Sequence, residues 1–134
     1  MPAHPDTQPK AVALLWQKTE ALLIFITALV IFAHLNSSLS WWAALLLFFV
    51  PDISFSGYFF GPKVGAFCYN AAHLYACGAI LFGTGMMMNN PFFMLAGCLW
   101  LAHSGFDRML GYGLKSPEGF SLTHLGQIGK KQGN

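Results

Sequence analysis

The chain has 134 residues, of which 55% are hydrophobic and only 9% are charged, and its formal net charge is +2. Soluble domains usually carry about 25% charged residues, so water is not the main solvent of this protein. The small net charge, spread over single basic residues and one adjacent pair, argues against a nucleic-acid partner.

The first predicted elements are a tail and a membrane span. Residues 1–15 contain three prolines among polar residues, which predicts a flexible N-terminal tail rather than the basic start of a signal peptide. Residues 16–35 are predominantly apolar, and their length suits a helix that crosses a bilayer, which needs about 20 residues. We expect this segment to be the first of four spans.

The second predicted span covers residues 40–51. It begins with an interfacial pair, Trp41 and Trp42, and Pro51 makes it short or kinked because proline lacks a backbone donor. Residues 53–60 are aromatic and amphipathic. We interpret them as an interfacial or re-entrant turn.

The last two predicted spans are residues 63–82, which stop before Gly83, and residues 91–111. The final span begins with a proline in its first turn and ends at Gly111. A polar C-terminal tail follows over residues 114–134. The predicted fold is therefore all-α, a four-helix integral membrane bundle in a multi-pass topology.

The basic residues give this bundle an orientation. They all fall on one side of the predicted topology: Lys10, Lys18, Lys63, Arg108, Lys115, Lys130 and Lys131. The opposite loops, residues 36–40 and 83–90, contain no charged residue. Lysine and arginine in short loops tend to stay in the cytoplasm, so both termini are expected there.

Ionisable groups inside the predicted spans are the main functional signal. A central charged residue costs about 2.5–3.5 kcal/mol on insertion scales, so each needs a partner or a function. With a rise of 1.5 Å per residue, Asp107 and His103 lie about 6 and 12 Å from the cytoplasmic end of their span, and His73 lies about 15 Å into its own. Asp52 and Glu20 lie in the same half of the bilayer.

The spacing of these groups predicts a metal site. His103 and Asp107 are four residues apart and Asn70 and His73 three apart, so each pair shares one helix face. Two imidazoles and several carboxylates are ligands that suit a divalent metal, with zinc the best match. The predicted ligands are Asp52, His73, His103 and Asp107; Glu20 would be the general base, Asn70 would orient substrate, and His124 and Arg108 are additional candidates.

The polar residues in the spans are also compatible with functions other than metal-dependent catalysis. His73 and His103 would also suit the axial positions of a haem. The polar cluster could instead stabilise a non-catalytic accessory subunit, or line a pocket for a small hydrophobic ligand. The aromatic surface would suit lipid, a homo-oligomer or a larger membrane complex.

Two blocks of the sequence resemble a family of small bacterial four-helix membrane proteins known only as a domain of unknown function. The C-terminal block comprises Trp100, His103, Phe106, Asp107, Arg108, Gly111, Tyr112, Gly113, Leu114, Lys115, Thr123, His124, Leu125 and Gly126. The central block comprises Pro51, Asp52, Ser54, Gly57, Tyr58, Gly61, Pro62, Asn70 and His73. The resemblance covers about residues 18–128 and implies the fold and the bacterial inner membrane, but no activity.

A more distant resemblance is to membrane-bound metal-dependent hydrolases related to zinc-dependent phospholipase C. Pro51 with Asp52, then His73, then His103 with Asp107 follow the order of motifs in that group. Asn70 stands where a further histidine is expected, and the Asp-x-Asp and Thr-His-Ser blocks are absent from the sequence. The resemblance implies metal-dependent hydrolysis of a lipid-linked or amphiphilic ester or phosphoester at the cytoplasmic leaflet.

Overall fold

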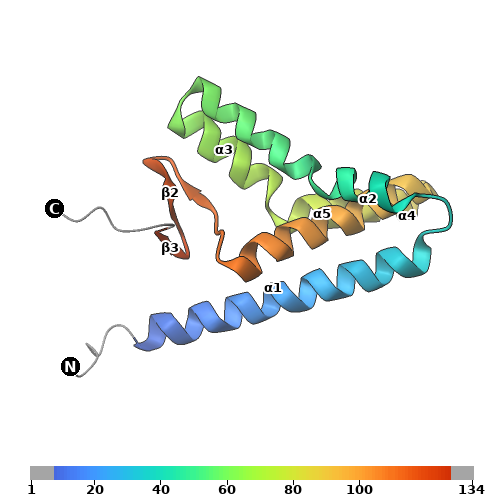
Figure 1. Ribbon diagram of the computed structural model, residues 1–134, viewed down its shortest axis with the longest axis horizontal. Helices are drawn as coiled ribbons and strands as arrows, with labels where there is room; N and C mark the ends of the chain where they lie inside the picture. Colours follow the sequence, from blue (N-terminus) through green and yellow to red (C-terminus); the bar gives the residue numbers. More distant parts are fainter. Residues whose placement is uncertain (1–7, 128–134) are drawn as a thin grey trace.

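The computed structural model describes residues 8–127, and most of this part of the chain is helical (Figure 1). The helices are α1 (Gln8–Leu35), α2 (Trp41–Phe48), the 3₁₀ helix η1 (Val50–Phe60), α3 (Pro62–Ala72), α4 (Tyr75–Met87) and α5 (Pro91–Leu110). Three short strands follow: β1 (Lys115–Ser116), β2 (Gly119–Thr123) and β3 (Gly126–Gln127).

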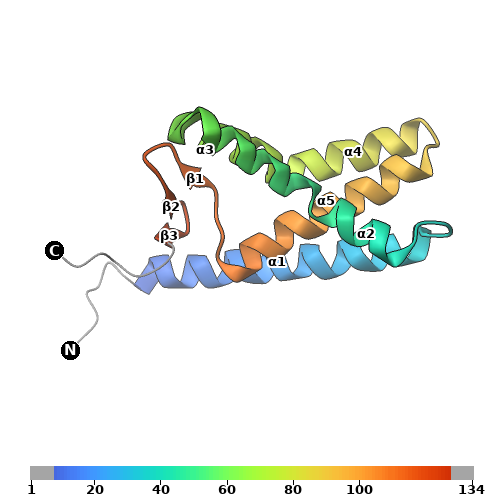
Figure 2. The same cartoon turned by 45° about the horizontal axis from the view of Figure 1, so that its top comes forward.

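Helix α5 is the centre of the arrangement. Helix α1 packs along one side of it and α4 along another, while η1 lies beside α3 (Figures 1 and 2). The interfaces use small residues: a Cβ on Gly97 of α5 would lie 2.5 Å from the Phe82 backbone nitrogen of α4. Close approach of this kind is typical of helices that associate inside a bilayer.

Two helical segments in residues 8–127 are long and apolar enough to cross a membrane, Lys10–Leu35 and Trp41–Phe60. Helices α3 and α4 pass the same criterion only as a pair, and they meet at a bend of 44°. These segments show a membrane-associated helical protein with two or three candidate spans. The prediction that α5 makes a fourth span, and that both termini are cytoplasmic, stays a prediction.

Helix α1 begins at Gln8, so residues 8–15, expected in the flexible tail, are helical. Most residues from position 10 to 15 are good helix formers: lysine, alanine and leucine, with one valine. Pro9 does not prevent the helix, because proline is tolerated in a first turn. Residues 1–7 of the predicted tail lie outside the described residues. Helix α4 likewise runs through Gly83 to Met87, beyond the predicted end of the third span.

The chain between residues 41 and 60 is one apolar segment with two helical geometries. Helix α2 ends at Phe48, close to the kink predicted at Pro51, and η1 then continues for 11 residues as a 3₁₀ helix. Such runs rarely exceed 3–4 residues. The packing of η1 on α3 is close, because a Cβ on Gly57 would lie 2.8 Å from the Cβ of Cys68.

The predicted third span is broken at His73 and Leu74, between α3 and α4. A break in a membrane helix frees backbone carbonyls that need new donors. Side chains supply them: the Cys77 thiol donates to Ala71 O (2.8 Å), Trp100 Nε1 to Ala72 O (2.6 Å) and the Arg108 guanidinium to His73 O (3.3 Å). Contacts from α4 and α5 therefore stabilise the break.

Helix α5 runs from Pro91 to Leu110, one residue short of the end of the predicted span at residue 111. Asn90 accepts a hydrogen bond from the Phe93 amide at its start, and Gly111 ends it with a positive φ of 96°. The polar tail is folded in part, because β1, β2 and β3 form a small antiparallel sheet. This sheet lies near the start of α1 at one end of the molecule (Figure 2).

Candidate metal centre

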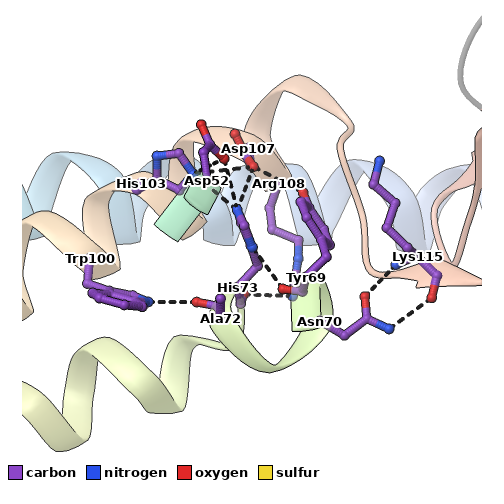
Figure 3. A network of polar contacts seen from close by, with 10 residues as sticks. All are labelled: Asp52, Tyr69, Asn70, Ala72, His73, Trp100, His103, Asp107, Arg108 and Lys115. Atoms are coloured by element: carbon purple, nitrogen blue, oxygen red, sulfur yellow. Dashed lines mark hydrogen bonds and ion pairs between the residues drawn. The ribbon is translucent and has the colours of Figure 1, made fainter. Parts of the chain in front are cut away.

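Four side chains from three elements meet at one point. Asp52 belongs to the first turn of η1, His73 follows the last residue of α3, and His103 and Asp107 lie one turn apart on α5. One ligand atom from each lies within 4.8 Å of all the others. These are the four predicted metal ligands, and Figure 3 shows them converging.

The distances between the ligand atoms suit a metal ion. The Nε2 atoms of His73 and His103 are 3.2 Å apart. Asp52 Oδ1 lies 3.3 and 3.1 Å from them, and Asp107 Oδ2 lies 3.4 and 3.6 Å from them. In a tetrahedral site with bonds of 2.0–2.1 Å, the ligand atoms are separated by about 3.3–3.4 Å. The residues present therefore fit a zinc-like ion.

The orientation of His73 is fixed by its own helix. Its Nδ1 donates a hydrogen bond of 2.8 Å to the carbonyl of Tyr69, one turn earlier, so its Nε2 lone pair faces the cluster. Metal-bound histidines usually hold their second nitrogen in this way. Tyr69 also stacks on the His73 ring, with centroids 3.8 Å apart, and its hydroxyl donates to Asp107 Oδ2 at 3.1 Å.

His103 is held by aromatic contacts. Its ring meets Phe48 and Phe49 edge-on, at centroid distances of 5.1 and 6.1 Å. Its Nδ1 is buried and has no hydrogen-bond partner among the described residues. A metal bound at Nε2 would leave the proton on Nδ1, so His103 differs from His73 in that its second nitrogen has no outer hydrogen-bond partner in the described structure.

The two carboxylates are the solvent-exposed part of the cluster, and the two imidazoles are its buried part. The side chains of His73 and His103 are 2% and 1% exposed, whereas those of Asp107 and Asp52 are 18% and 34% exposed. A ligand can therefore approach from the carboxylate side. Asp52 is the most accessible of the four groups.

The other predicted site residues lie outside this cluster of four. Glu20 is exposed on α1 and interacts electrostatically with Tyr75 on α4. Asn70 makes two hydrogen bonds to the backbone of the C-terminal tail. Its Oδ1 accepts from the Lys115 amide at 2.6 Å, and its Nδ2 donates to the Lys115 carbonyl at 2.8 Å. Asn70 therefore holds the tail beside α3, and its expected role in orienting substrate stays a prediction.

The two additional candidates also have structural contacts. Arg108 lies 5.0 Å from the centre of the Tyr75 ring and donates to the carbonyl at the break after α3. His124 is exposed, and its Nδ1 accepts from the Leu114 amide at 2.7 Å. Neither side chain is among the four that meet at the centre.

Two residues near the centre were missed by the sequence reasoning, Tyr69 and Lys115. Lys115 is 4% exposed, and its ammonium lies 5.0 Å from the centre of the Tyr69 ring. Burial lowers the pKa of this ammonium, and the nearby Asp107 carboxylate opposes that shift. Tyr69 lies four residues before His73, and this spacing, which puts two residues on one helix face, could have identified it. No sequence signal places Lys115 near the site.

Comparison with known families decides which family this is. The model of a domain of unknown function, DUF4260, matches residues 14–128. The chain belongs to this family. Comparison with curated proteins finds no match, and neither does comparison with solved structures. The family match agrees with the expected resemblance and carries no activity with it.

The geometry of this DUF4260 member favours a single metal ion over the haem alternative. Two axial ligands of a haem iron lie about 4 Å apart on opposite sides of the porphyrin, given bonds of about 2 Å. The two Nε2 atoms here are only 3.2 Å apart, and two carboxylate oxygens lie beside them. A porphyrin ring does not fit between these groups.

Replacing Tyr69 with phenylalanine tests whether the Tyr69 hydroxyl strengthens metal binding by its hydrogen bond to Asp107. Tyr69→Phe removes the hydroxyl that donates to Asp107 Oδ2 and keeps the ring that stacks on His73. Loss of such an outer contact typically weakens metal binding about 10- to 100-fold, so we expect at least a tenfold increase in the zinc Kd. Competition with a coloured chelator in detergent measures it.

Tyr112→Phe is the matched control, because Tyr112 is 43% exposed. This variant should bind zinc as the wild type does. Equal zinc affinity in Tyr69→Phe and Tyr112→Phe would show that the Tyr69 hydroxyl does not support the centre.

Proposed function

We propose that this protein is a multi-pass enzyme of the bacterial cytoplasmic membrane that uses a divalent metal, zinc above all, to hydrolyse a lipid-linked or amphiphilic ester or phosphoester. The observation that carries the proposal is the convergence of Asp52, His73, His103 and Asp107 at separations suited to one ion. A membrane location makes an amphiphile from the cytoplasmic leaflet the natural substrate.

The proposed topology places both termini in the cytoplasm. Lys10 and His124 line the same surface groove, which brings the start of α1 beside the tail. The Lys18 ammonium lies 3.6 Å from the position of a Cβ on Gly111, at the end of α5. Basic residues far apart in the sequence thus gather at one end of the molecule, which supports a common cytoplasmic side.

We divide the four residues of the cluster into three that bind the metal ion and one that accepts a proton. Catalytic zinc sites typically use three protein ligands and keep the fourth position open. We assign His73, His103 and Asp107 to hold the ion, since they are the three most buried groups. Asp52 is the most exposed, so we assign it to accept a proton, the role that the sequence had suggested for Glu20.

Hydrolysis at this centre would need a bound metal ion and one proton acceptor. A bound zinc-like ion would polarise a carbonyl or phosphoryl oxygen and lower the pKa of water to about 7. Asp52 takes one proton from the attacking water and returns it to the alcohol that leaves. Each turnover consumes one water and leaves the protein unchanged.

Asp52→Asn separates metal binding from chemistry. The variant keeps the three holding ligands, so we expect it to retain at least half of the wild-type zinc. Turnover should fall about 100-fold or more, which is the usual contribution of a general base. The assay is hydrolysis of phosphatidic acid, phosphatidylglycerol and monoacylglycerol in mixed micelles, with zinc measured by elemental analysis.

Glu118→Gln is the control, because Glu118 is an exposed acid of the tail. It should leave zinc content and turnover unchanged. If the zinc-loaded wild type hydrolyses none of these lipids, the hydrolase proposal is overturned, and a structural role for the metal in an accessory subunit is the better account.

A further inference from the structure

A surface groove lies between the start of α1 and the C-terminal tail, at the end of the molecule that carries the small sheet (Figure 2). Its volume is about 440 Å³. Small-molecule sites have volumes of roughly 300–1,000 Å³. Helix α1 contributes Lys10, Leu14 and Gln17 to the lining, and the tail contributes His124 and Leu125. None of these residues belongs to the metal centre, so the groove is a separate candidate site.

The tail side of the groove is built around His124. Its Nδ1 accepts a hydrogen bond of 2.7 Å from the Leu114 amide, and its own amide donates to the Leu114 carbonyl at 3.0 Å. The ring also lies against Gly113, where a Cβ would be 2.6 Å from Nδ1. Because Nδ1 accepts, the proton of the neutral ring is on Nε2. This N–H has no acceptor among the described residues, so it is available to a ligand in the groove.

The groove has a positive electrostatic potential. Lys10 contributes an ammonium, and no acidic side chain of the described residues lines the groove. Burial lowers the pKa of His124, and the positive charge of Arg108 lowers it further. The charge of Arg108 therefore reaches the groove from α5. An anion is the ligand that this potential favours.

The groove lies at the level of the lipid headgroups. The candidate span Lys10–Leu35 has 26 residues, which at a rise of 1.5 Å per residue gives a length of about 39 Å. The hydrocarbon core of a bilayer is about 30 Å thick, so one end of this helix extends into the headgroup layer. Lys10, Gln17 and Lys18 lie near its start, whereas its last turns are mostly apolar. The end that extends is therefore the one that lines the groove.

We propose that the groove binds the phosphate headgroup of an anionic phospholipid from the leaflet that borders the start of α1. The Lys10 ammonium and the His124 Nε2–H donate hydrogen bonds to the phosphate oxygens, and such bonds to a charged group are stronger than neutral ones. Leu14 and Leu125 contact the first carbons of the acyl chains. A zwitterionic headgroup binds less tightly, because the described lining offers its ammonium no carboxylate.

The bound lipid would hold the tail against α1. Two hydrogen bonds from Asn70 already join the tail to α3, and the groove lies on the side of the tail that faces α1. This role goes beyond the proposed hydrolysis, and it involves none of the four residues that converge at the metal centre.

Native mass spectrometry of the full-length protein in detergent tests the lipid preference. The protein is titrated with dioleoylphosphatidylglycerol and, separately, with dioleoylphosphatidylcholine, and each bound lipid is identified by its mass. We expect the phosphatidylglycerol to bind about five times as tightly or more, because a lysine at a membrane surface attracts anionic lipid. Excess inorganic phosphate should not displace it, since phosphate makes no contact with the two leucines.

A charge placed in the groove tests the location. Gln17→Glu adds a carboxylate to the lining, so we expect it to weaken phosphatidylglycerol binding about tenfold. Thr19→Glu is the matched control, because Thr19 is an exposed residue of α1 outside the lining, and it should bind this lipid as the wild type does. Lys10→Gln should weaken binding about fivefold, and Lys10→Arg should preserve it.

Four results would overturn the proposal. The first is equal affinity of the wild type for the two lipids, and the second is equal affinity of Gln17→Glu and Thr19→Glu for phosphatidylglycerol. Displacement of the lipid by inorganic phosphate would indicate a phosphate site instead. A phosphatidylglycerol affinity that changes when zinc is added would place the lipid at the metal centre, whereas an unchanged affinity supports the groove whatever the fate of the proposed hydrolysis.

Discussion

His103→Ala is expected to remove zinc from the protein. The substitution deletes one of two imidazoles, and the Nε2 atom it removes is within 3.6 Å of the other three ligand atoms. The remaining histidine and two carboxylates form a weaker and more open site, so we expect the zinc content to fall from about one ion per chain to less than about 0.1. Elemental analysis of detergent-purified protein measures it.

His34→Ala is the matched control for this prediction. His34 is an exposed histidine in the last turn of α1, outside the cluster of four. This variant should keep about one zinc per chain. A His103→Ala protein that still binds stoichiometric zinc, or a wild type that binds none after reconstitution, would defeat the assignment of the centre.

The second large effect is expected from Gly97→Ala at the contact between α4 and α5. A Cβ on Gly97 would lie 2.5 Å from Phe82 N and 2.8 Å from Gly78 O. Both atoms belong to the backbone, so the helices must move apart. We expect the free energy of unfolding to fall by about 3 kcal/mol, which corresponds to a decrease in Tm of about 10 °C.

Gly83→Ala gives a matched comparison on α4. A Cβ at Gly83 has no atom within 4 Å in the described structure, and alanine favours the helix. Its Tm should equal or exceed that of the wild type, measured by thermal unfolding in detergent. Similar Tm values for the two variants would contradict the close packing of α4 on α5.

The convergence of the four side chains was predictable from their spacing along the helices and their depth in the apolar segments. His103 and Asp107 share a face of α5 by helical periodicity, and the depth estimate placed His73 and Asp52 at their level. Ionisable groups are rare in these apolar segments, so the set of candidate ligands is small. The same argument selected Glu20, which is exposed and lies apart from the cluster. Depth alone does not give the direction of a side chain.

Features that depend on contacts distant in the sequence were not predictable. No glycine or proline marks the break after α3, which is stabilised by Trp100 and Arg108, about 30 residues further along the chain. The tail contact between Asn70 and Lys115 joins residues 45 positions apart. The long 3₁₀ geometry of η1 likewise has no sequence signal beyond Pro51.

The proposed ligands, which lie at the end of α3 and on α5, would set the order of metal binding during biosynthesis. Segments of a membrane protein enter the bilayer as the ribosome makes them, and α5 is the last helix to emerge. Of the three residues assigned to hold the ion, only His73 is made before α5, and one ligand cannot retain an ion against cellular chelators. A divalent ion at this centre would therefore be acquired only after α5 has docked, so zinc content would report how much of the newly made protein has completed its assembly.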